Sequence, residues 1–334
     1  MKKLMSLVLS IAVIMGLSAC SSSTQNEEKV KVAVVLAGST GDRSFYDSAS
    51  EGLKALEESG KVKGNLIECQ NDSSMFTSNL VSAAEKNEIV VAVGWEFKDI
   101  LEEYAPQMTD TKFIFVDNDL DNVGDNLLSI TYAQNEGSFL VGYIAGKLTT
   151  TNKIGVVTGE ESETMNDFTL GYEAGAKYAN PNVEVLIKCA NDYEDPARGK
   201  KLALALYDKK CDIIFQVASR TGEGVFEAAK ERKLFAIGVD SDQKYINPDV
   251  IICSMTKQVG KSIEQTISAY IDDGTWNGGQ IWVADMSTGL VDVGYGDDTM
   301  TQQVDDELKA EVEQIKADIV SGKIKVPTAF ESNK

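Results

Sequence analysis

Two aspartates, Asp117 and Asp240, each follow a short apolar run that is typical of a buried strand. A carboxylate at the end of a strand accepts hydrogen bonds from ring N–H groups or sugar hydroxyls, and two such carboxylates accept from two sides. The alternative is that each caps the helix of the turn that follows it. We favour ligand contact for both, whereas Asp119 and Asp242 are more typical of caps.

A glycine-containing turn, residues 38–46, carries a second group of candidate side chains. Asp42 or Ser44 can cap the helix that follows, and free amides at that helix start favour an electronegative ligand atom. Phe45 can lie flat against a ligand ring or pack in the core as a hydrophobic staple, and the sequence leaves both roles open. Tyr46 comes directly after it.

Two cationic side chains are candidates near the same strand ends. The segment 216–224 resembles a phosphate loop only loosely, since it lacks the Gly-Lys-Ser/Thr ending and the dinucleotide spacing. We interpret it as a turn that faces a cleft, in which Arg220 either favours an anionic ligand or pairs with Glu223. Lys257 can reach the cleft from a hinge or remain an ordinary surface lysine.

The composition excludes several classes of function. The chain contains no histidine, which removes the commonest general base and metal ligand. Without a nucleophile elbow or a metal cluster, we expect no enzyme, metal or cofactor. The net charge of −20 argues against nucleic-acid binding. Widely spaced cysteines without a Cys-x-x-Cys pair predict buried free thiols at Cys69, Cys189, Cys211 and Cys253.

The elements that must position these residues alternate between strands and helices. Short β-branched runs alternate with segments whose apolar residues lie three and four apart, which predicts parallel sheets covered by helices on both faces. The expected strands are 30–37, 66–70, 89–93, 112–116, 128–131, 153–158, 183–189, 212–217, 234–239, 250–254 and 281–286.

The same strand–helix unit is present twice in the sequence. Phe45 aligns with Phe168 and Asp117 with Asp240 at nearly the same offset, as do the apolar strands that precede them. The fold class is therefore α/β, with two open parallel-sheet lobes. Lobes that face each other bring the carboxyl ends of their strands to one cleft.

The expected domain limits follow from this repeat. We expect the first lobe to contain residues 30–132 plus about 254–284, and the second to contain 133–253 plus about 285–330. The chain then passes between the lobes several times, and these hinge strands would let the lobes close around a ligand.

The N-terminus predicts export and a lipid anchor. Residues 1–19 combine a basic start, a short apolar run and small residues before a cysteine, which is typical of a signal peptide. The segment Leu-Ser-Ala-Cys resembles the bacterial lipobox, so Cys20 is expected to become the lipidated first residue, with 20–29 as a polar tether. A plain signal peptide with a coincidental cysteine is the alternative.

Longer motifs across residues 30–330 resemble one family, the basic membrane protein lipoproteins, which are purine nucleoside-binding subunits of ABC importers. The motifs are Gly-Asp-Arg-Ser-Phe at 41–45, Glu-Gly-Ser-Phe-Leu-Val-Gly-Tyr-Ile-Ala-Gly at 136–146, Asn-Asp-Phe at 166–168, Gly-Tyr-Glu-Ala-Gly at 171–175, Asp-Pro-Ala-Arg-Gly-Lys at 195–200 and Ile-Gly-Val-Asp-Ser-Asp-Gln at 237–243.

The resemblance implies a type I periplasmic-binding-protein clamshell that holds a purine between two aromatic rings, matched here by Phe45 and Tyr193. The resemblance also implies acidic residues that hold the base and the ribose, and a lysine that contacts the ribose. Asp117, Asp240 and Lys257 match these polar positions. The full expected set of ligand-binding residues is Asp42, Phe45, Tyr46, Asp117, Phe168, Tyr193, Arg220, Asp240 and Lys257.

Three departures from the family pattern leave the ligand open. Leu36 or Ala37 stands where the first strand commonly ends in an aspartate, Tyr46 replaces an asparagine, and Ser-Arg at 219–220 replaces a glycine pair. We expect a monomeric, extracytoplasmic binding protein, lipid-anchored at the cell membrane, that works with an ABC permease and ATPase. The alternatives are another solute, such as a flavin, sugar or signal molecule, or a non-transport surface sensor or adhesin.

Overall fold

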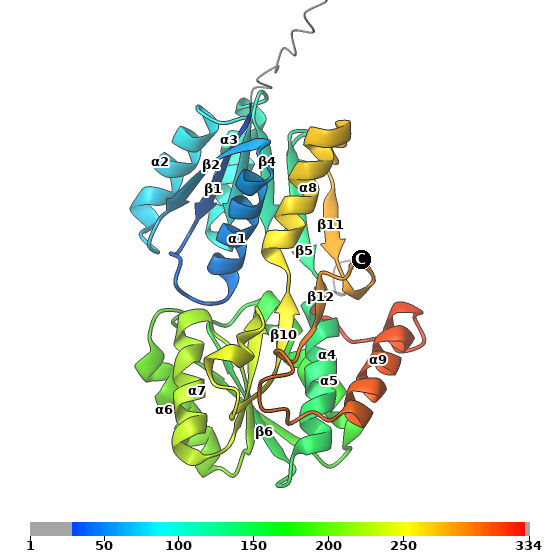
Figure 1. Cartoon of the computed structure of the whole chain (residues 1–334). Coiled ribbons are helices and arrows are strands. Elements are labelled where there is room, and N and C mark those ends of the chain that lie inside the picture. Colours follow the sequence, from blue (N-terminus) through cyan, green and yellow to red (C-terminus); the bar gives the residue numbers. More distant parts are fainter. Residues whose placement is uncertain (1–28, 331–334) are drawn as a thin grey trace, which may run out of the picture.

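The structure, a computed structural model, describes residues 29–330. The predicted signal peptide 1–19, the lipidation site Cys20 and residues 20–28 of the tether lie outside the described residues. Within them, two α/β lobes stack end to end, and each is built on its own six-stranded sheet (Figure 1).

Lobe 1 is built on a sheet of strand order β11-β5-β4-β3-β1-β2, in which every neighbouring pair is parallel. Its strands are β1 (Val30–Leu36), β2 (Val62–Glu68), β3 (Ile89–Val93), β4 (Lys112–Val116), β5 (Leu127–Tyr132) and β11 (Ile281–Ala284). Its helices are α1 (Phe45–Glu58), α2 (Ser73–Ala84), η1 (Trp95–Phe97), α3 (Lys98–Tyr104), η2 (Ala105–Gln107) and α8 (Val259–Asp273).

Lobe 2 is built on a sheet of order β12-β10-β9-β8-β6-β7, which is parallel except for the β10–β12 pair. Its strands are β6 (Lys153–Thr158), β7 (Glu184–Cys189), β8 (Ile213–Val217), β9 (Phe235–Asp240), β10 (Ile251–Lys257) and β12 (Val291–Gly294). Its helices are α4 (Gln134–Leu148), α5 (Glu163–Ala179), α6 (Pro196–Asp208), η3 (Ser219–Gly222), α7 (Glu223–Arg232), η4 (Gln243–Ile246), η5 (Met286–Thr288) and α9 (Asp306–Val320).

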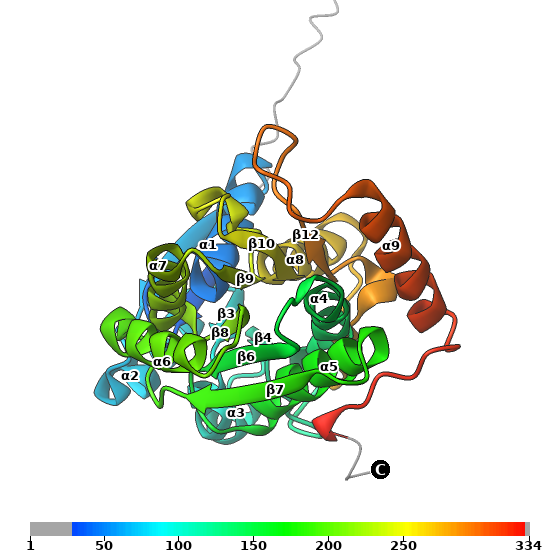
Figure 2. The ribbon, with the colours of Figure 1, turned by 90° about the horizontal axis from the view of Figure 1, so that it is seen from below.

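Both faces of each sheet are buried, which explains the unbroken apolar runs in the sequence. Along β1, Val32 and Val34 face the layer that contains α1, whereas Ala33 and Val35 face the layer that contains α2. In lobe 2, α4 and α5 cover one face, and α6 and α7 cover the other (Figure 2). The parallel strands of each lobe therefore end at one edge, where turns must carry the polar side chains.

Three chain segments cross between the lobes, joining β5 to α4, β10 to α8, and β11 to β12. The segments are hydrogen-bonded to one another: Ala133 donates its N–H to the carbonyl of Ala284 at 3.0 Å, and Gln258 to that of Leu290 at 2.8 Å. The crossings lie at the sheet edges formed by β5 and β11 in lobe 1 and by β10 and β12 in lobe 2. They form the hinge.

The predicted fold class is confirmed, and the repeat is visible in the strand order. The order β4-β3-β1-β2 in lobe 1 has its counterpart in β9-β8-β6-β7 of lobe 2. The sequence placed the start of β2 too late and missed β12. Each of these strands pairs with a single neighbour, so polar residues such as Lys63 and Asp292 are tolerated there and hide the apolar pattern.

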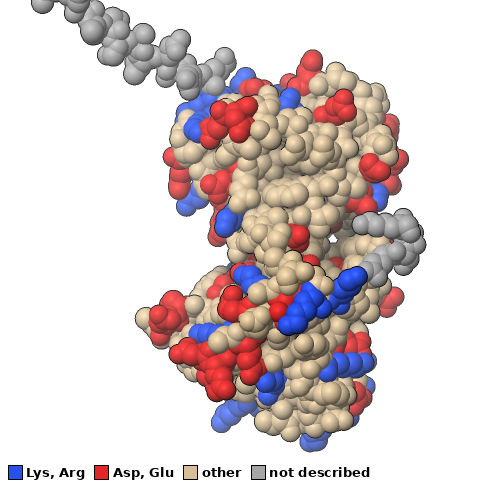
Figure 3. Space-filling model, turned by 90° about the vertical axis from the view of Figure 1, so that its right-hand side faces the viewer, with Lys and Arg blue, Asp and Glu red and all other residues tan. Residues whose placement is uncertain are grey.

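The described surface fits a compact two-lobed body. On the face shown in Figure 3, the molecule narrows between the lobes, and acidic side chains lie among basic ones on both. No helix within residues 29–330 has the length and apolar composition to cross a bilayer. The four cysteines of this range form no disulfide; Cys189 is half-buried and the others, Cys69, Cys211 and Cys253, are buried.

Candidate functional site

A cavity of about 430 Å³ lies between the lobes, at the carboxyl ends of their parallel strands. Its wall is formed by turns that follow β1, β3 and β4 of lobe 1 and β6, β7, β8 and β10 of lobe 2. Five of the predicted site residues line it: Phe45, Tyr46, Asp117, Tyr193 and Lys257. The other four, Asp42, Phe168, Arg220 and Asp240, lie behind or beside the wall.

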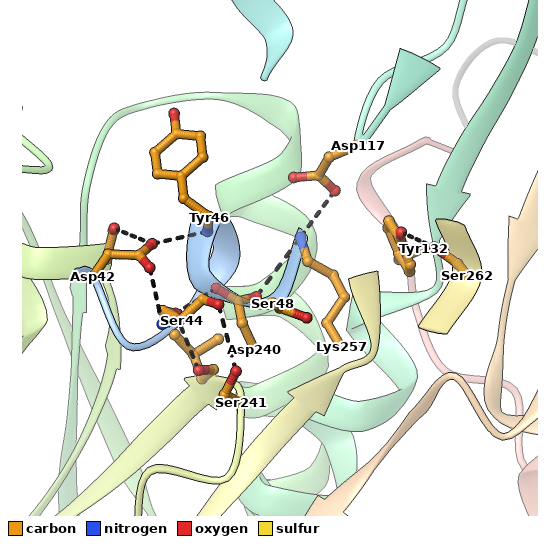
Figure 4. Close-up of polar contacts among 12 residues, drawn as sticks. Asp42, Ser44, Tyr46, Ser48, Asp117, Tyr132, Asp240, Ser241, Lys257 and Ser262 are labelled. Atoms are coloured by element: carbon orange, nitrogen blue, oxygen red, sulfur yellow. Dashed lines mark hydrogen bonds and ion pairs between the residues drawn. The ribbon is translucent and has the colours of Figure 1, made fainter. Parts of the chain in front are cut away.

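Lys257 is the charged centre of this site. Its Nζ lies 2.9 Å from Asp117 Oδ1 of lobe 1 and 3.8 Å from Asp240 Oδ1 of lobe 2, and its side chain is 3% exposed (Figure 4). Lys257 ends β10, where the chain is about to cross to lobe 1, so its side chain can reach carboxylates of both lobes. A buried ammonium needs such partners, since an unpaired one is costly.

Aromatic rings surround the same ammonium. Nζ of Lys257 lies 5.0 Å from the ring centre of Phe45, 5.2 Å from that of Tyr132 and 5.3 Å from that of Phe168. At these distances the ring faces attract a cation. Phe45 is half-buried: it packs against the core and also lines the cavity. Phe168 is fully buried behind the lysine, packed 6.4 Å from the ring of Phe215.

Asp240 is buried and only partly satisfied. Its Oδ2 accepts a hydrogen bond from Ser44 Oγ at 2.7 Å, while Oδ1 accepts none within the described part of the chain. Burial raises the pKa of this carboxyl to about 6, and the nearby charge of Lys257 opposes that rise. In this arrangement Oδ1 is buried beside Lys257 and does not line the cavity. The ligand contact expected of Asp240 therefore stays a prediction.

Asp117 and Asp240 share an uncommon backbone conformation. Their φ angles are 69° and 63°, in the left-handed region that few residues other than glycine occupy. Such strained residues persist where the surrounding structure over-determines them, and they cluster at ligand sites. The two aspartates that the sequence repeat paired are therefore equivalent in backbone geometry as well as in position.

Asp42 organises the turn between β1 and α1. Its carboxylate accepts the backbone N–H groups of Ser44, Tyr46 and Asp47, each at 3.1 Å, and so serves the first turn of α1 as a cap. Its Oδ2 also accepts Ser219 Oγ at 3.0 Å from lobe 2. Both oxygens of Asp42 are thus used in the fold and in the contact between lobes.

The two cavity tyrosines pack on glycine backbone, one in each lobe. A Cβ at Gly38 would lie 2.4 Å from the ring of Tyr46, and one at Gly159 would lie 1.9 Å from the ring of Tyr193. Any larger residue would displace these rings. Burial raises the pKa of both phenols, so both stay protonated and can donate hydrogen bonds.

Arg220 pairs with an acidic residue other than the one proposed from the sequence. Its guanidinium lies 3.3 Å from Glu194, whereas Glu223 lies 3.8 Å from Arg43 of lobe 1. Arg220 does not line the cavity; the preceding residue, Ser219, does. Of the two expected caps, Asp242 caps η4, while Asp119 lines the cavity and pairs with Lys98 at 3.5 Å.

Several wall residues were missed by the sequence reasoning. Glu96 follows β3, and its Oε2 is covered and accepts no hydrogen bond from the described residues. A Cβ built at Gly94 would lie 2.5 Å from Glu96 Oε2 and 2.9 Å from the Cβ of Ala37. The carboxylate of Glu96 therefore lies close to Ala37, a position where the sequence departs from the family pattern. The only signal was its place after the strand-end pair Val-Gly. The others missed include Trp95, Asn118, Glu160, Met165, Ser219 and Phe330.

The model of one protein family, described as Bmp, ABC transporter substrate-binding protein PnrA-like, matches residues 29–329. The chain belongs to this family. Basic membrane protein A of Borreliella burgdorferi is 32% identical over 337 residues, which cover 99% of this chain and 97% of that protein. A Lactococcus lactis subsp. cremoris protein named ABC transporter nucleoside-binding protein BmpA is 32% identical over 344 residues, with 96% of each chain covered.

Solved structures agree on the fold of this family member. A solute-binding protein of an ABC transporter system from Aeropyrum pernix K1 superimposes with a TM-score of 0.81 at 24% identity, covering 91% of this chain and 95% of that one. A Caulobacter myo-inositol binding protein superimposes with a TM-score of 0.62 at 14% identity, covering 86% and 98%. The predicted family and the type I periplasmic-binding-protein clamshell are both confirmed.

Proposed function

We propose that this family member is the lipid-anchored binding subunit of an ABC importer and that its cavity holds a purine nucleoside. The observation that carries the proposal is the placement of Lys257, bonded to Asp117 of one lobe and facing Asp240 of the other, within a wall of aromatic rings. This arrangement can read a ribose and a flat base at the same time. It uses no bond-making chemistry, so the proposed role is capture and delivery.

The chemistry of the wall suits the two halves of a nucleoside. A volume of about 430 Å³ falls within the usual range of small-molecule pockets, about 300–1,000 Å³. Asp117 can accept hydrogen bonds from ribose hydroxyls, and Lys257 can donate one to their oxygens. Phe45, Tyr46 and Tyr193 supply ring surface for the base, and each stacked pair adds about 0.5–1.5 kcal/mol beyond area burial.

Relatives and the N-terminal sequence support the rest of the proposal. The Lactococcus relative is named for nucleoside binding, and the Borreliella relatives are named as membrane proteins. Lipidation at Cys20 would hold the protein on the extracytoplasmic face of the cell membrane, beside the permease and ATPase of its transporter. We propose that it works there as a monomer.

Calorimetry with inosine, guanosine and adenosine tests the ligand class. We expect at least one of them to bind the chain without its first 20 residues with a Kd of about 1 μM or tighter, as the enclosed polar and aromatic wall implies. No binding by any of the three would reject the nucleoside proposal. Mass spectrometry of ligand released from the protein as purified would then identify the alternative, a flavin, sugar or signal molecule.

Phe45→Ala tests whether the base stacks on this ring. Loss of the platform should weaken nucleoside binding by about 1–3 kcal/mol, as base–aromatic stacking does elsewhere, without unfolding the protein. Tyr178→Ala is the matched control, because Tyr178 is 58% exposed on α5 and does not line the cavity. Equal affinities of the two variants would assign Phe45 to the core alone.

A further inference from the structure

The cavity wall carries more negative charge than its own cations neutralise. Six carboxylates and two lysines line it. Both lysines are already paired, Lys257 with Asp117 at 2.9 Å and Lys98 with Asp119 at 3.5 Å. Among residues 29–330, no cation lies within 4.0 Å of the remaining four carboxylates, which belong to Glu96, Glu160, Glu161 and Glu163.

Glu96 differs from the other three because its carboxylate is partly covered by the protein. Glu161 and Glu163 are exposed and Glu160 is half-buried. Gly94, with a φ of +124° that favours glycine, turns the chain after β3 so that the carboxylate of Glu96 lies back over the strand end. Its Oε2 accepts no hydrogen bond from the described residues. The terminal torsion of a Glu side chain is broad, so a modest rotation can present both oxygens to a ligand in the cavity.

A carboxylate in this setting is costly until a donor reaches it. Burial raises the pKa of Glu96 to about 7, and the charge of Glu160 across the cavity adds to the rise. Tyr46, Tyr193 and Cys69 are also close enough to interact with its charge, and because burial raises the pKa of all three, they stay neutral near pH 7. Lys98, which lines the same cavity, pairs with Asp119. A ligand that presents N–H groups here would satisfy the bare oxygen and stabilise the ionised form.

We propose that Glu96 reads the base edge and makes the site selective for a 2-amino-6-oxopurine, the base of guanosine. This inference rests on the proposed function. The N1–H and exocyclic N2–H of such a base lie side by side and match the two oxygens of one carboxylate. Hypoxanthine presents only N1–H. Adenine presents an unprotonated N1, whose lone pair faces an ionised carboxylate unfavourably.

Glu96→Gln tests the assignment with little change in shape. By calorimetry at pH 8, we expect the wild-type protein to bind guanosine more tightly than inosine, and inosine more tightly than adenosine. In Glu96→Gln the affinity for guanosine should fall about tenfold or more, and the guanosine preference should largely vanish. Glu102→Gln is the matched control, since Glu102 is an exposed residue of α3 outside the cavity wall.

Proton counting gives a second readout. Near pH 7, guanosine binding should release protons from Glu96 of the wild type, seen as an enthalpy that depends on the buffer. It should release clearly fewer in Glu96→Gln, in which buried carboxyls such as that of Asp240 remain. The wild-type preference for guanosine over adenosine should grow as pH rises from 6 to 8, because ionised Glu96 accepts N–H groups and protonated Glu96 can donate to adenine N1. Guanosine preference retained within twofold in Glu96→Gln would overturn this inference alone, whereas failure of all three nucleosides to bind the wild type would overturn the proposed function with it.

Discussion

One carboxylate oxygen of Asp240, Oδ1, accepts no hydrogen bond from residues 29–330, although the ammonium of Lys257 lies 3.8 Å away. At the same time its backbone lies in the left-handed region. Both features cost folding free energy, which is typical of residues retained for binding. A substitution that removes the charge therefore separates stability from function at this residue.

Asp240→Asn should stabilise the ligand-free protein at pH 7.5 by about 1–3 kcal/mol. Because burial raises the pKa of Asp240 to about 6, above the ordinary value of 3.8, ionisation of this carboxyl disfavours the folded state. The free-energy cost of ionising Asp240 in the folded state is absent below about pH 4, grows as the pH rises to about 6 and is constant above that. Urea unfolding of both proteins at pH 7.5 and pH 4.5 checks the prediction, and the gain should shrink at the lower pH. A less stable variant at pH 7.5 would contradict it.

At the residue scale, strand ends made part of the site predictable. Asp117, Asp240 and Lys257 each end or follow a strand, and the carboxyl ends of parallel strands share an edge, so their proximity followed from the βαβ pattern. Glu96 could not be found in this way. The role proposed for it rests on which carboxylates lack a cation, and that is decided by side-chain contacts between segments far apart in the sequence.

The turn between β1 and α1, residues 37–44, is the element that joins the lobes on the cavity side. Ser44 Oγ lies 2.7 Å from Asp240 and 3.2 Å from the carbonyl of Val239, both in lobe 2. Gln243 donates its side-chain amide to the carbonyl of Arg43 at 3.0 Å. These bonds exist only while the lobes are together, so we expect the turn to stabilise the closed form.

Ser44→Ala should loosen the closed state without touching the cavity wall. Loss of a hydrogen bond to a buried carboxylate costs about 1.5–3 kcal/mol, so ligand dissociation should become about tenfold faster or more. Stopped-flow fluorescence measures the rate, and small-angle scattering of the ligand-bound protein should show a larger radius of gyration. Ser78→Ala on α2, whose exposed hydroxyl bonds only within its own helix, is the control. Unchanged dissociation would mean that other contacts hold the lobes together.

At the element scale, the buried strands were predicted well because both faces of each sheet are covered. Along β3 every residue is buried, so its sequence is wholly apolar. The edge strands were predicted poorly for the converse reason: β2 has one sheet neighbour and a largely exposed or half-buried surface. The role of Asp42 was open between cap and ligand contact. Its four hydrogen bonds favour the structural role.

At the scale of the whole molecule, the negative charge of the cavity wall predicts which compounds related to a nucleoside bind weakly. A nucleoside 5′-monophosphate would bring about two negative charges toward a wall whose lysines are already paired. We expect guanosine monophosphate to bind at least about 100-fold more weakly than guanosine, with a smaller gap at high salt because ions screen the repulsion.

Competition calorimetry at about 0.05 M and about 0.5 M salt checks this expectation. Between these two concentrations the screening length falls from about 14 Å to about 4 Å. A neutral substituent of similar reach, 5′-O-acetylguanosine, separates charge from size. Similar affinities for the monophosphate and the nucleoside would show that the wall charges do not reach the 5′ position.

The two-lobed architecture could be predicted from the sequence because the repeat and the alternation of elements extend over almost the whole chain. The orientation of the lobes could not. It depends on contacts such as Ser219 with Asp42, in which each partner comes from a turn with no periodic pattern.

The placement of the hinge at one edge also has a consequence for how the bound molecule leaves. The opposite edges of the sheets are formed by β2 and β7, and within residues 29–330 one exposed hydrogen bond joins the turns that follow these strands, from Asn71 to Glu194 at 3.3 Å. A rotation about the hinge gives this far edge the longest lever arm and moves Lys257, at the pivot, the least. We therefore expect the mouth to open from the β2–β7 side, so that water enters there first and a ligand held by Lys257 loses that contact last.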